Sequence, residues 1–462
     1  MRFRLLLAVS SCALLAACPE PKPPPPPPAP VKDAGPPPRT VTVLVTGHES
    51  GELPLRAPRL LQEWTDREGW PNVIAVSTGD SFAGNAISSR FDGLPTAEAM
   101  KAMQYRASAL GNHDLDLGAE VLRGFIQASG VQVLAANVRR KDGKDSPLPG
   151  HLVLERGGVK VGLVGLTSEK TLYTTGPGRA AEYELAPAGL VLPAAITEVR
   201  KAGAEAVVLI LDDCFSAVQP LFAAHPEWEV DAVVGGRCEG PQESTSGKTP
   251  FYSIGDDLSA YVSVRLELSP GGHSVKTSRQ VVAADGKEDA DLAALRARWQ
   301  EKLKVELGQV IGFSKKGFPA EAPELRTLVA TALRDEAKAD AALVNKRGVR
   351  AGLPKGPITR ETVYSMIPFE NAVLTVKVKG ELLLKLKSHP EAVLVLPKGK
   401  VDPAKDYLLA TTEYLYFGGD DLGFEAAAPN PELTGQVWQT PVVAWIARQA
   451  STEKRPLEGL LK

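Results

Sequence analysis

Two short polar motifs, each following an apolar β-rich run, constrain the fold of this chain more than any other feature. The run Val73–Ser77 leads into Gly79–Gly84, which reads Gly-Asp-Ser-Phe-Ala-Gly. The run Ala107–Leu110 leads into Gly111–Asp116, which reads Gly-Asn-His-Asp-Leu-Asp. Comparable runs alternate with helical patterns over residues 41–284, as in strands that are buried on both faces. The alternation predicts a layered α/β domain whose site lies at the carboxyl ends of its strands.

The expected elements can be given by their residues. Strands are expected at Val41–Val45, Val73–Ser77, Ala107–Leu110, Val159–Leu166, Ala206–Leu211, Ala232–Val234, Ala341–Val344, Val373–Val378 and Tyr407–Thr411. Helices are expected at Ala57–Glu68, Leu94–Met103, Asp289–Leu307 and Leu325–Ala339. The second group of elements, from about Gly308 onward, predicts a further α/β domain.

The polar residues of the two motifs suit metal-assisted chemistry. The two carboxylate oxygens of Asp80 point apart and can bridge two cations, and Asn112 offers a neutral amide oxygen to one of them. His113 would stand beside the cations as an acid or an electrostatic stabiliser, with Asp116 orienting its ring. Both motifs together, in this order, are more specific than either one alone.

After its proline-rich segment, almost the whole chain resembles the 5'-nucleotidase family. The two motifs resemble that family's Gly-Asp-Thr-Phe-x-Gly and Gly-Asn-His-Glu-Phe-Asp, and residues 341–350 resemble its Asn-Gly-Gly-x-Ile-Arg segment. The resemblance implies a four-layered metallophosphoesterase-like sandwich domain over residues 40–287 and an interdomain helix over 288–307. A smaller α/β 5'-nucleotidase C-terminal domain, over 308–462, would bind the substrate.

The resemblance also implies roles for residues of the second domain. Asn345 and Arg350 match positions that contact the polar end of the ligand, and Asp420 matches the acid that contacts the sugar. Phe369 and Tyr414 match two aromatic residues that sandwich a nucleobase, although both rings could instead belong to the core. A guanidinium that binds phosphate and two rings that stack on a base are chemically reasonable in these places.

Several metal-ligand positions of the family carry other residues here. His48 stands where the family has an aspartate, and Ser50 stands where it has a histidine. Asp212, Arg237 and Glu239 replace further histidines. These replacements put the family's two-metal chemistry in doubt.

One cation could still bind to His48, Asp80 and Glu239, with Glu49 as a reserve ligand. A second could bind to Asp80, Asn112 and Asp212, an all-oxygen set that suits Mg²⁺, Mn²⁺ or Ca²⁺ better than Zn²⁺. The expected cofactor is therefore one or two divalent ions, with Mn, Zn or Mg as candidates.

Arg237 is the replacement that most opposes a second cation. A guanidinium cannot coordinate a metal, and at close range it repels one. It could instead replace the charge of that ion and pair with Asp212 or with a substrate phosphate.

Cys214 and Cys238 each lie next to a replaced ligand position, so the resemblance places their sulfurs close together. Three interpretations remain open from the sequence. The cysteines could form a disulfide, as an oxidising compartment favours. They could be thiolate ligands of a soft metal beside His48, or a reactive redox pair whose pKa Arg237 lowers.

The first 39 residues indicate export. Residues 1–18 have two arginines, a short apolar run and Leu-Ala-Ala-Cys, a pattern typical of a lipoprotein signal that ends at Cys18. Residues 19–39 are proline-rich and predict a stiff spacer of roughly 60 Å. The expected location is the bacterial cell envelope, periplasmic or facing the outer membrane, with a lipid anchor as the membrane contact.

These features predict a phosphoric ester hydrolase of nucleotidase type that acts on a small-molecule phosphate ester or nucleotide. The net charge of −2 gives no electrostatic reason to expect nucleic acid as a partner. Two alternatives belong to other classes: a nucleotide-binding lipoprotein that has lost catalysis, and a thiol or redox enzyme that uses Cys214 and Cys238. His151, His225, His273 and His389 match no motif and are expected at the surface or at helix edges.

Overall fold

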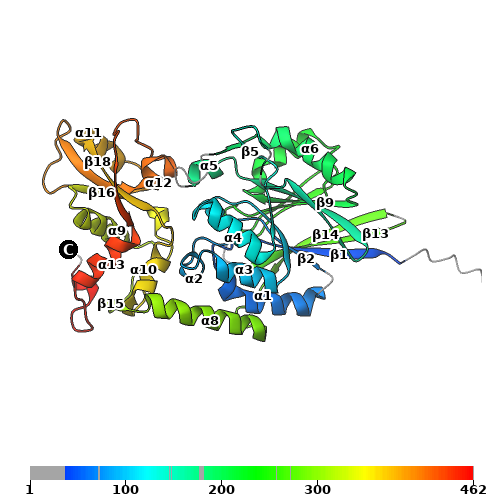
Figure 1. Ribbon diagram of the computed structural model, residues 1–462, viewed down its shortest axis with the longest axis horizontal. Coiled ribbons are helices and arrows are strands. Elements are labelled where there is room, and N and C mark those ends of the chain that lie inside the picture. The colour runs from blue at the N-terminus through cyan, green and yellow to red at the C-terminus, as the bar shows by residue number, and fades with distance from the viewer. Residues whose placement is uncertain are drawn as a thin grey trace, which may run out of the picture. The chain divides into compact units, whose positions relative to one another are not determined.

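A computed structural model describes residues 37–460, except for 71–72, 145, 147, 176–181, 256–257 and 271. The expected signal peptide, the lipid anchor at Cys18 and nearly all of the proline-rich spacer lie outside the described residues. Residues 38–462 belong to one compact unit, in which the two predicted domains follow one another (Figure 1). Among the described residues, no helix is both long and apolar enough to cross a membrane.

The first six-stranded sheet contains the strands that precede both sequence motifs. Its order is β14 (Gly272–Val281), β13 (Ala260–Ser269), β1 (Arg39–Thr46), β2 (Val73–Ser77), β3 (Tyr105–Ala109) and β4 (Gln132–Leu134). Strands β1 to β4 are parallel, whereas β13 pairs antiparallel with both β1 and β14. The carboxyl ends of β1, β2 and β3 therefore meet at one edge of the sheet.

The second six-stranded sheet supplies the remaining loops of the site. Its order is β11 (Glu243–Ser246), β12 (Thr249–Ser253), β10 (Ala232–Gly235), β9 (Ala206–Asp212), β7 (Val159–Thr167) and β6 (His151–Arg156). Strands β7, β9, β10 and β12 are parallel, so β9 and β10 also end at a common edge. A separate pair consists of β5 (Val138–Arg140) and β8 (Tyr183–Leu185).

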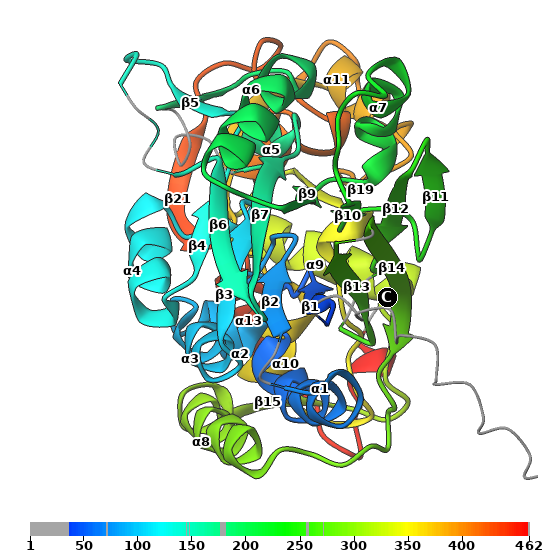
Figure 2. The same ribbon diagram turned by 90° about the vertical axis from the view of Figure 1, so that its right-hand side faces the viewer.

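The two sheets pack face to face, with helices on both outer sides (Figures 1 and 2). Val43 and Val76 of the first sheet share one core with Val161 and Val208 of the second. The outer side of the first sheet is covered by α1 (Leu53–Glu68), α3 (Leu94–Ala102) and α4 (Ala119–Ser129), and that of the second by α6 (Ala188–Lys201) and α7 (Gln219–Ala224). Short helices α2 (Ala86–Ser89) and α5 (Thr171–Thr174) lie in the connections. This confirms the predicted four-layered α/β sandwich.

Helix α8 (Ala290–Leu307) is the predicted interdomain helix. The Asp289 carboxylate caps its first turn by accepting a hydrogen bond from the backbone of Leu292 at 2.9 Å. Its buried residues Trp299 and Leu303 share a core with α2 and with Tyr364 of α10 (Arg360–Met366). Helix α8 thus contacts both domains.

The C-terminal domain is built on a five-stranded sheet. Its order is β19 (Ala392–Val395), β16 (Ala341–Asn345), β20 (Asp406–Thr412), β18 (Ala372–Lys379) and β21 (Glu432–Val437). Two hydrophobic cores pack against this sheet. One contains residues of α9 (Pro323–Glu336), α10 and α13 (Gln439–Arg448). The other contains residues of α11 (Gly380–Lys387) and α12 (Glu413–Tyr416). Strands β15 (Val310–Ser314) and β17 (Gly356–Thr359) form a small antiparallel pair. The second α/β domain is confirmed, and the boundaries at 287 and 308 stay a prediction.

Candidate active site

The candidate site lies where five strands of the first domain end. The side chains come from the loops that follow these strands: His48 after β1, Asp80 after β2, Asn112 and His113 after β3, Asp212 at the end of β9, and Arg237 after β10. Residues far apart in the sequence meet here because the carboxyl ends of parallel strands share one edge of each sheet.

Asp114 joins the two sequence motifs and has no role in the sequence-based prediction. Its buried carboxylate accepts hydrogen bonds from the backbone nitrogens of Ser81 at 2.7 Å, Gly111 at 2.9 Å and Asp80 at 3.2 Å. Burial, followed by the charge of Asp80, raises the pKa of Asp114 to about 7. The signal that could have identified it is a second carboxylate inside a motif whose backbone N–H groups need acceptors.

The close approach of the same two loops requires a glycine at position 111. A Cβ atom on Gly111 would come within 2.1 Å of Asp80 Oδ1 and 2.3 Å of the Asp80 nitrogen. The Asp80 oxygen also accepts the backbone N–H of His113 at 2.9 Å. One oxygen of Asp80 is therefore held by the second motif, and the other is left for a different partner.

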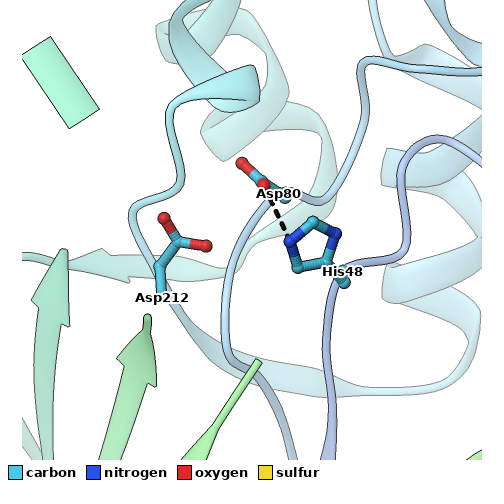
Figure 3. Close-up of side chains that lie close together, drawn as sticks. All are labelled: His48, Asp80 and Asp212. Atoms are coloured by element: carbon cyan, nitrogen blue, oxygen red, sulfur yellow. Dashed lines mark ion pairs between the residues drawn. The ribbon is translucent and has the colours of Figure 1, made fainter. Parts of the chain in front are cut away.

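His48, Asp80 and Asp212 form a group that fits one cation (Figure 3). One potential ligand atom from each residue lies within 4.8 Å of the others, and His48 Nε2 is 3.3 Å from Asp80 Oδ2. Asp80 Oδ2 and both oxygens of Asp212 are buried and accept no hydrogen bond. Buried carboxylate oxygens without donors are costly unless a cation or a proton compensates them, so these residues fit a divalent ion.

The two carboxylates of this group differ in their electrostatics. Burial alone would raise the pKa of Asp80, but His113, His48 and Arg237 lower it to about 2. Burial and the charge of Asp80 raise the pKa of Asp212 well above its ordinary value, although Arg237 opposes the shift. The site therefore contains one firmly ionised carboxylate and a second whose charge needs a further cation.

Arg237 occupies the place predicted for a second cation. Its Nη1 donates a 2.6 Å hydrogen bond to Asn112 Oδ1, the atom that was expected to coordinate the ion. The same nitrogen lies 3.7 Å from Asp212 Oδ2. The set Asp80, Asn112 and Asp212 does not fit a second metal in this arrangement, and the pairing of Arg237 with Asp212 is the one anticipated from its charge.

Two residues that were expected at the first cation lie elsewhere. Glu239 is exposed and outside the group, because the chain turns outward after the buried Cys238. Glu49, the reserve ligand, is fully buried and accepts hydrogen bonds from Thr46 Oγ1 at 2.7 Å and Ser77 Oγ at 2.8 Å. Burial raises the pKa of Glu49 to about 8, against the effect of those hydroxyl groups. Asp212 takes the place that the sequence analysis assigned to Glu239.

Cys214 and Cys238 form a disulfide. It joins the loop after Asp212 to the loop that carries Arg237, and it packs in the core beneath the second sheet. Both sulfurs are used in this bond, so neither is a thiolate ligand or a free nucleophile here. Of the three interpretations, the structure supports the disulfide.

His113 is oriented by its predicted partner. Its Nδ1 lies 2.6 Å from Asp116 Oδ2, and its ring stacks on Phe369 with 4.7 Å between centroids and 11° between planes. Burial lowers the pKa of His113, but the carboxylates of Asp116 and Asp80 outweigh it and the net pKa is raised. The structure places the Phe369 ring against His113, where the resemblance implied a sandwich with Tyr414.

The predicted ligand residues of the C-terminal domain form two sets that face one cavity. Asp420 accepts hydrogen bonds from Asn345 Nδ2 at 2.7 Å and from the Tyr414 hydroxyl at 3.0 Å. The Arg350 guanidinium lies 5.7 Å from the centroid of the Phe369 ring. These five side chains face the same cavity as His113.

That cavity has a volume of about 730 Å³ and is lined by residues of both domains. The predicted residues among its lining are Asn112, His113, Asp116, Arg237, Asn345, Arg350, Phe369, Tyr414 and Asp420. Lys170, Arg347 and His389 also line it and had been assigned no role. His389 follows α11 at a helix edge, as expected, but no local pattern reveals that this edge faces the cavity.

Comparisons with known proteins agree with this architecture. Residues 310–391 match the family model of the 5'-nucleotidase C-terminal domain. The 5'-nucleotidase of Homo sapiens is 24% identical over 370 residues, which are 70% of this chain and 64% of that protein. The 5'-nucleotidase of Vibrio cholerae is 24% identical over 372 residues, 68% of this chain and 66% of that protein. The chain thus spans just under two thirds of the length of these relatives.

A solved structure extends the likeness in fold to nearly the whole chain. The crystal structure of a 5'-nucleotidase precursor from Thermus thermophilus superimposes with a TM-score of 0.73 at 20% identity. The match covers 91% of this chain and 98% of that one. The order of the two domains is therefore the same in both.

Proposed function

We propose that this chain, which is similar to 5'-nucleotidases in sequence and fold, hydrolyses a phosphate ester, with nucleotides as the substrate class. One observation carries the proposal. Buried carboxylate oxygens of Asp80 and Asp212 accept no hydrogen bond and lie beside His48 Nε2. Such a group is expected where a divalent cation binds. His113, which contacts Asp80, and Arg237, which contacts Asp212, line the large cavity.

We propose that His48, Asp80 and Asp212 hold that ion, with Mn²⁺ or Mg²⁺ favoured over Zn²⁺ because two of the three ligands are carboxylates. When bound, the ion would supply positive charge against the phosphoryl oxygens and so stabilise the negative charge that develops on them. Asp80 is suited to be a ligand of this ion because its low pKa keeps the carboxylate ionised.

His113 would donate a proton to the leaving oxygen of the ester. Asp116 holds Nδ1, which leaves Nε2 as the nitrogen for the substrate. The carboxylates of Asp116 and Asp80 raise the pKa of the ring, which favours the protonated form that a general acid requires. The stack on Phe369 keeps the imidazole in one plane while the proton moves.

The C-terminal side of the cavity would bind the rest of the substrate. Arg350 can donate two parallel hydrogen bonds to a phosphate, and Asp420 can accept hydrogen bonds from sugar hydroxyl groups. Asn345 and Tyr414 hold the Asp420 carboxylate in place for that contact. Phe369 and Tyr414 remain the candidates for contact with a base.

We also propose that the protein acts in the cell envelope, anchored through lipid at Cys18. The pattern of residues 1–18 and the proline-rich composition of 19–39 support this location. A disulfide next to the site is consistent with an oxidising compartment.

The test is hydrolysis of p-nitrophenyl phosphate and nucleoside monophosphates by the full chain with Mn²⁺, Mg²⁺ or Zn²⁺. We expect turnover that EDTA abolishes and that His113→Asn lowers by about 100-fold or more. His225→Asn, a change in a surface histidine, is the matched control and should leave the rate unchanged. No turnover of any of these esters with any of the three ions would refute the proposal.

A second candidate is nucleotide binding without catalysis, and one observation favours it. Arg237 takes the Asn112 oxygen, so the family's second cation is excluded from this arrangement. Binding of nucleoside monophosphates without turnover, unaffected by His113→Asn, would favour this candidate. A thiol or redox enzyme is not supported, because the disulfide uses both cysteines.

A further inference from the structure

We propose that the Arg237 guanidinium permanently takes the place of a second cation, so that the site binds a single divalent ion and uses Arg237 as a direct phosphate ligand. This inference rests on the proposed phosphoesterase function and deepens it. It assigns to one residue a role that relatives with two metals would give to an ion.

The contacts of Arg237 are those of a bound cation. Its Nη1 donates to Asn112 Oδ1 at 2.6 Å and lies 3.7 Å from Asp212 Oδ2. Asn112 is 1% exposed and Asp212 is fully buried, so water cannot easily replace the guanidinium at either oxygen. An ion at this place would first have to displace a charge-assisted hydrogen bond.

The charge of Arg237 is also permanent. A guanidinium does not lose its proton in proteins. A change of pH therefore does not vacate the position. A second divalent ion close to this fixed charge would be repelled with little solvent screening.

Arg237 reaches the substrate side as well as the metal side. Its side chain is 26% exposed and lines the cavity together with His113 and Arg350. The bond to Asn112 uses one of its five N–H donors. The remaining donors can contact a phosphoryl group in the cavity, which a purely structural arginine would not do.

The backbone around Arg237 is held on both sides. The preceding residue, Gly236, donates its N–H to Leu211 O at 3.0 Å and to Asp213 O at 3.1 Å. The following residue, Cys238, is bonded to Cys214. The guanidinium is therefore presented from a fixed turn, as a substitute for an ion requires.

Metal stoichiometry tests the first half of the inference without any turnover. Native mass spectrometry of the full chain titrated with Mn²⁺ should show one ion per wild-type chain and two per Arg237→His chain, because histidine frees Asn112 and adds a ligand. Arg140→Ala, which removes a half-buried arginine paired with Asp142 and Glu182, should stay at one. Two ions on the wild type would overturn the inference.

Binding of inorganic phosphate tests the second half. In the presence of Mn²⁺, calorimetry should show that Arg237→Ala weakens phosphate binding by roughly 10- to 100-fold, the usual range for a charged hydrogen bond. Arg237→Lys keeps the positive charge but has fewer N–H donors, so its phosphate affinity should lie between those of the wild type and Arg237→Ala. It should also bind one Mn²⁺ per chain. This variant serves as the test if the alanine variant does not fold. An affinity within about twofold of wild type in both variants, or no phosphate binding by the wild type, would overturn the inference.

These results separate the inference from the proposed function. One Mn²⁺ and an Arg237-dependent phosphate affinity, without hydrolysis of any ester, would uphold the role of Arg237 and refute the enzyme. Hydrolysis with two Mn²⁺ per chain would do the reverse.

Discussion

The two pairs of loops that form the site differ in how they are held together. The loops after β2 and β3 keep the residues of the family motifs and are joined by hydrogen bonds to Asp114. The loops after β9 and β10 carry replaced residues and are joined by the Cys214–Cys238 disulfide as well as by the backbone hydrogen bonds of Gly236. The edge of the first sheet is thus organised around a buried carboxylate, whereas the edge of the second sheet has an added covalent link.

The two pairs also differ in how their carboxylates are supported. One oxygen of Asp80 accepts a hydrogen bond from the backbone N–H of His113, whereas Asp212 accepts no hydrogen bond and faces Arg237. The first pair can position a metal ligand with its own backbone. The second pair depends on positive charge, part of which the chain supplies itself through Arg237.

The largest effect should come from a change of Asp80, the metal ligand in the loops after β2 and β3. Asp80→Asn removes the ionised carboxylate of the cation group and should weaken Mn²⁺ binding by at least about 1,000-fold, since even outer residues of metal sites cost 10- to 100-fold. Calorimetric titration measures this, with the exposed Asp66→Asn as control. Retained Mn²⁺ affinity would show that the cation binds elsewhere.

The next largest effect should be on stability. Asp114→Ala leaves three buried backbone N–H groups without an acceptor and should lower the free energy of unfolding by about 4 kcal/mol, measured in urea. Asp213 is the comparable residue of the other pair, and it accepts hydrogen bonds from Cys214 N and Ser168 Oγ. Asp213→Ala should cost less than about 2 kcal/mol. Equal costs would remove the contrast between the two loop pairs.

Removal of the disulfide should have a smaller effect, confined to the second pair. Its cysteines are 24 residues apart, so Cys214→Ser with Cys238→Ser should cost about 3 kcal/mol of stability. Phosphate affinity should fall as well, because the turn that presents Arg237 loses a restraint. A drop in Mn²⁺ affinity at unchanged phosphate affinity would instead indicate that the bond supports Asp212 rather than Arg237.

The last expected effect, about 1.4 kcal/mol for each pH unit, is a pH dependence beneath the first pair. The folded-state pKa of Glu49 is raised from 4.5 to about 8, so its contribution to stability is complete below 4.5 and is lost as the pH rises toward 8. In chelator, the wild-type free energy of unfolding should fall by up to about 1.4 kcal/mol per pH unit from this residue in that window. Glu49→Gln should reduce this decrease in the free energy of unfolding only in part, because the raised pKa of Asp114 also lowers stability as the pH rises. An unchanged slope in urea unfolding at several pH values would contradict this.

Secondary structure was largely predictable because its signals are local. The predicted strand Val73–Ser77 agrees with β2, and the predicted helix at 289–307 agrees with α8 to within one residue. Helix α1 begins at Leu53, earlier than the expected Ala57, since Pro54 is tolerated in a first turn. Burial patterns of single elements can be read along the chain without knowledge of their neighbours.

The site was predictable only in part. His48 and Asp80 were expected at the first cation and Asp212 at the second, whereas the structure groups all three. Glu239 was expected at the first cation and is exposed. Asp114 was overlooked because its partners are backbone groups, so its position as a second carboxylate inside the motif was the only signal of its role. Which backbone groups such a side chain contacts on another loop is decided by the packing of the two loops.

The sequence by itself determined the layered α/β class, the two domains and the group of residues that follow the strand ends. Only the tertiary structure decided that Arg237 reaches Asn112, a residue 125 positions away, and that Cys214 and Cys238 are bonded. The physical reason is one of range. Apolar periodicity acts within an element, whereas a hydrogen bond or an ion pair depends on a few ångströms between loops that only the packed sheets bring together.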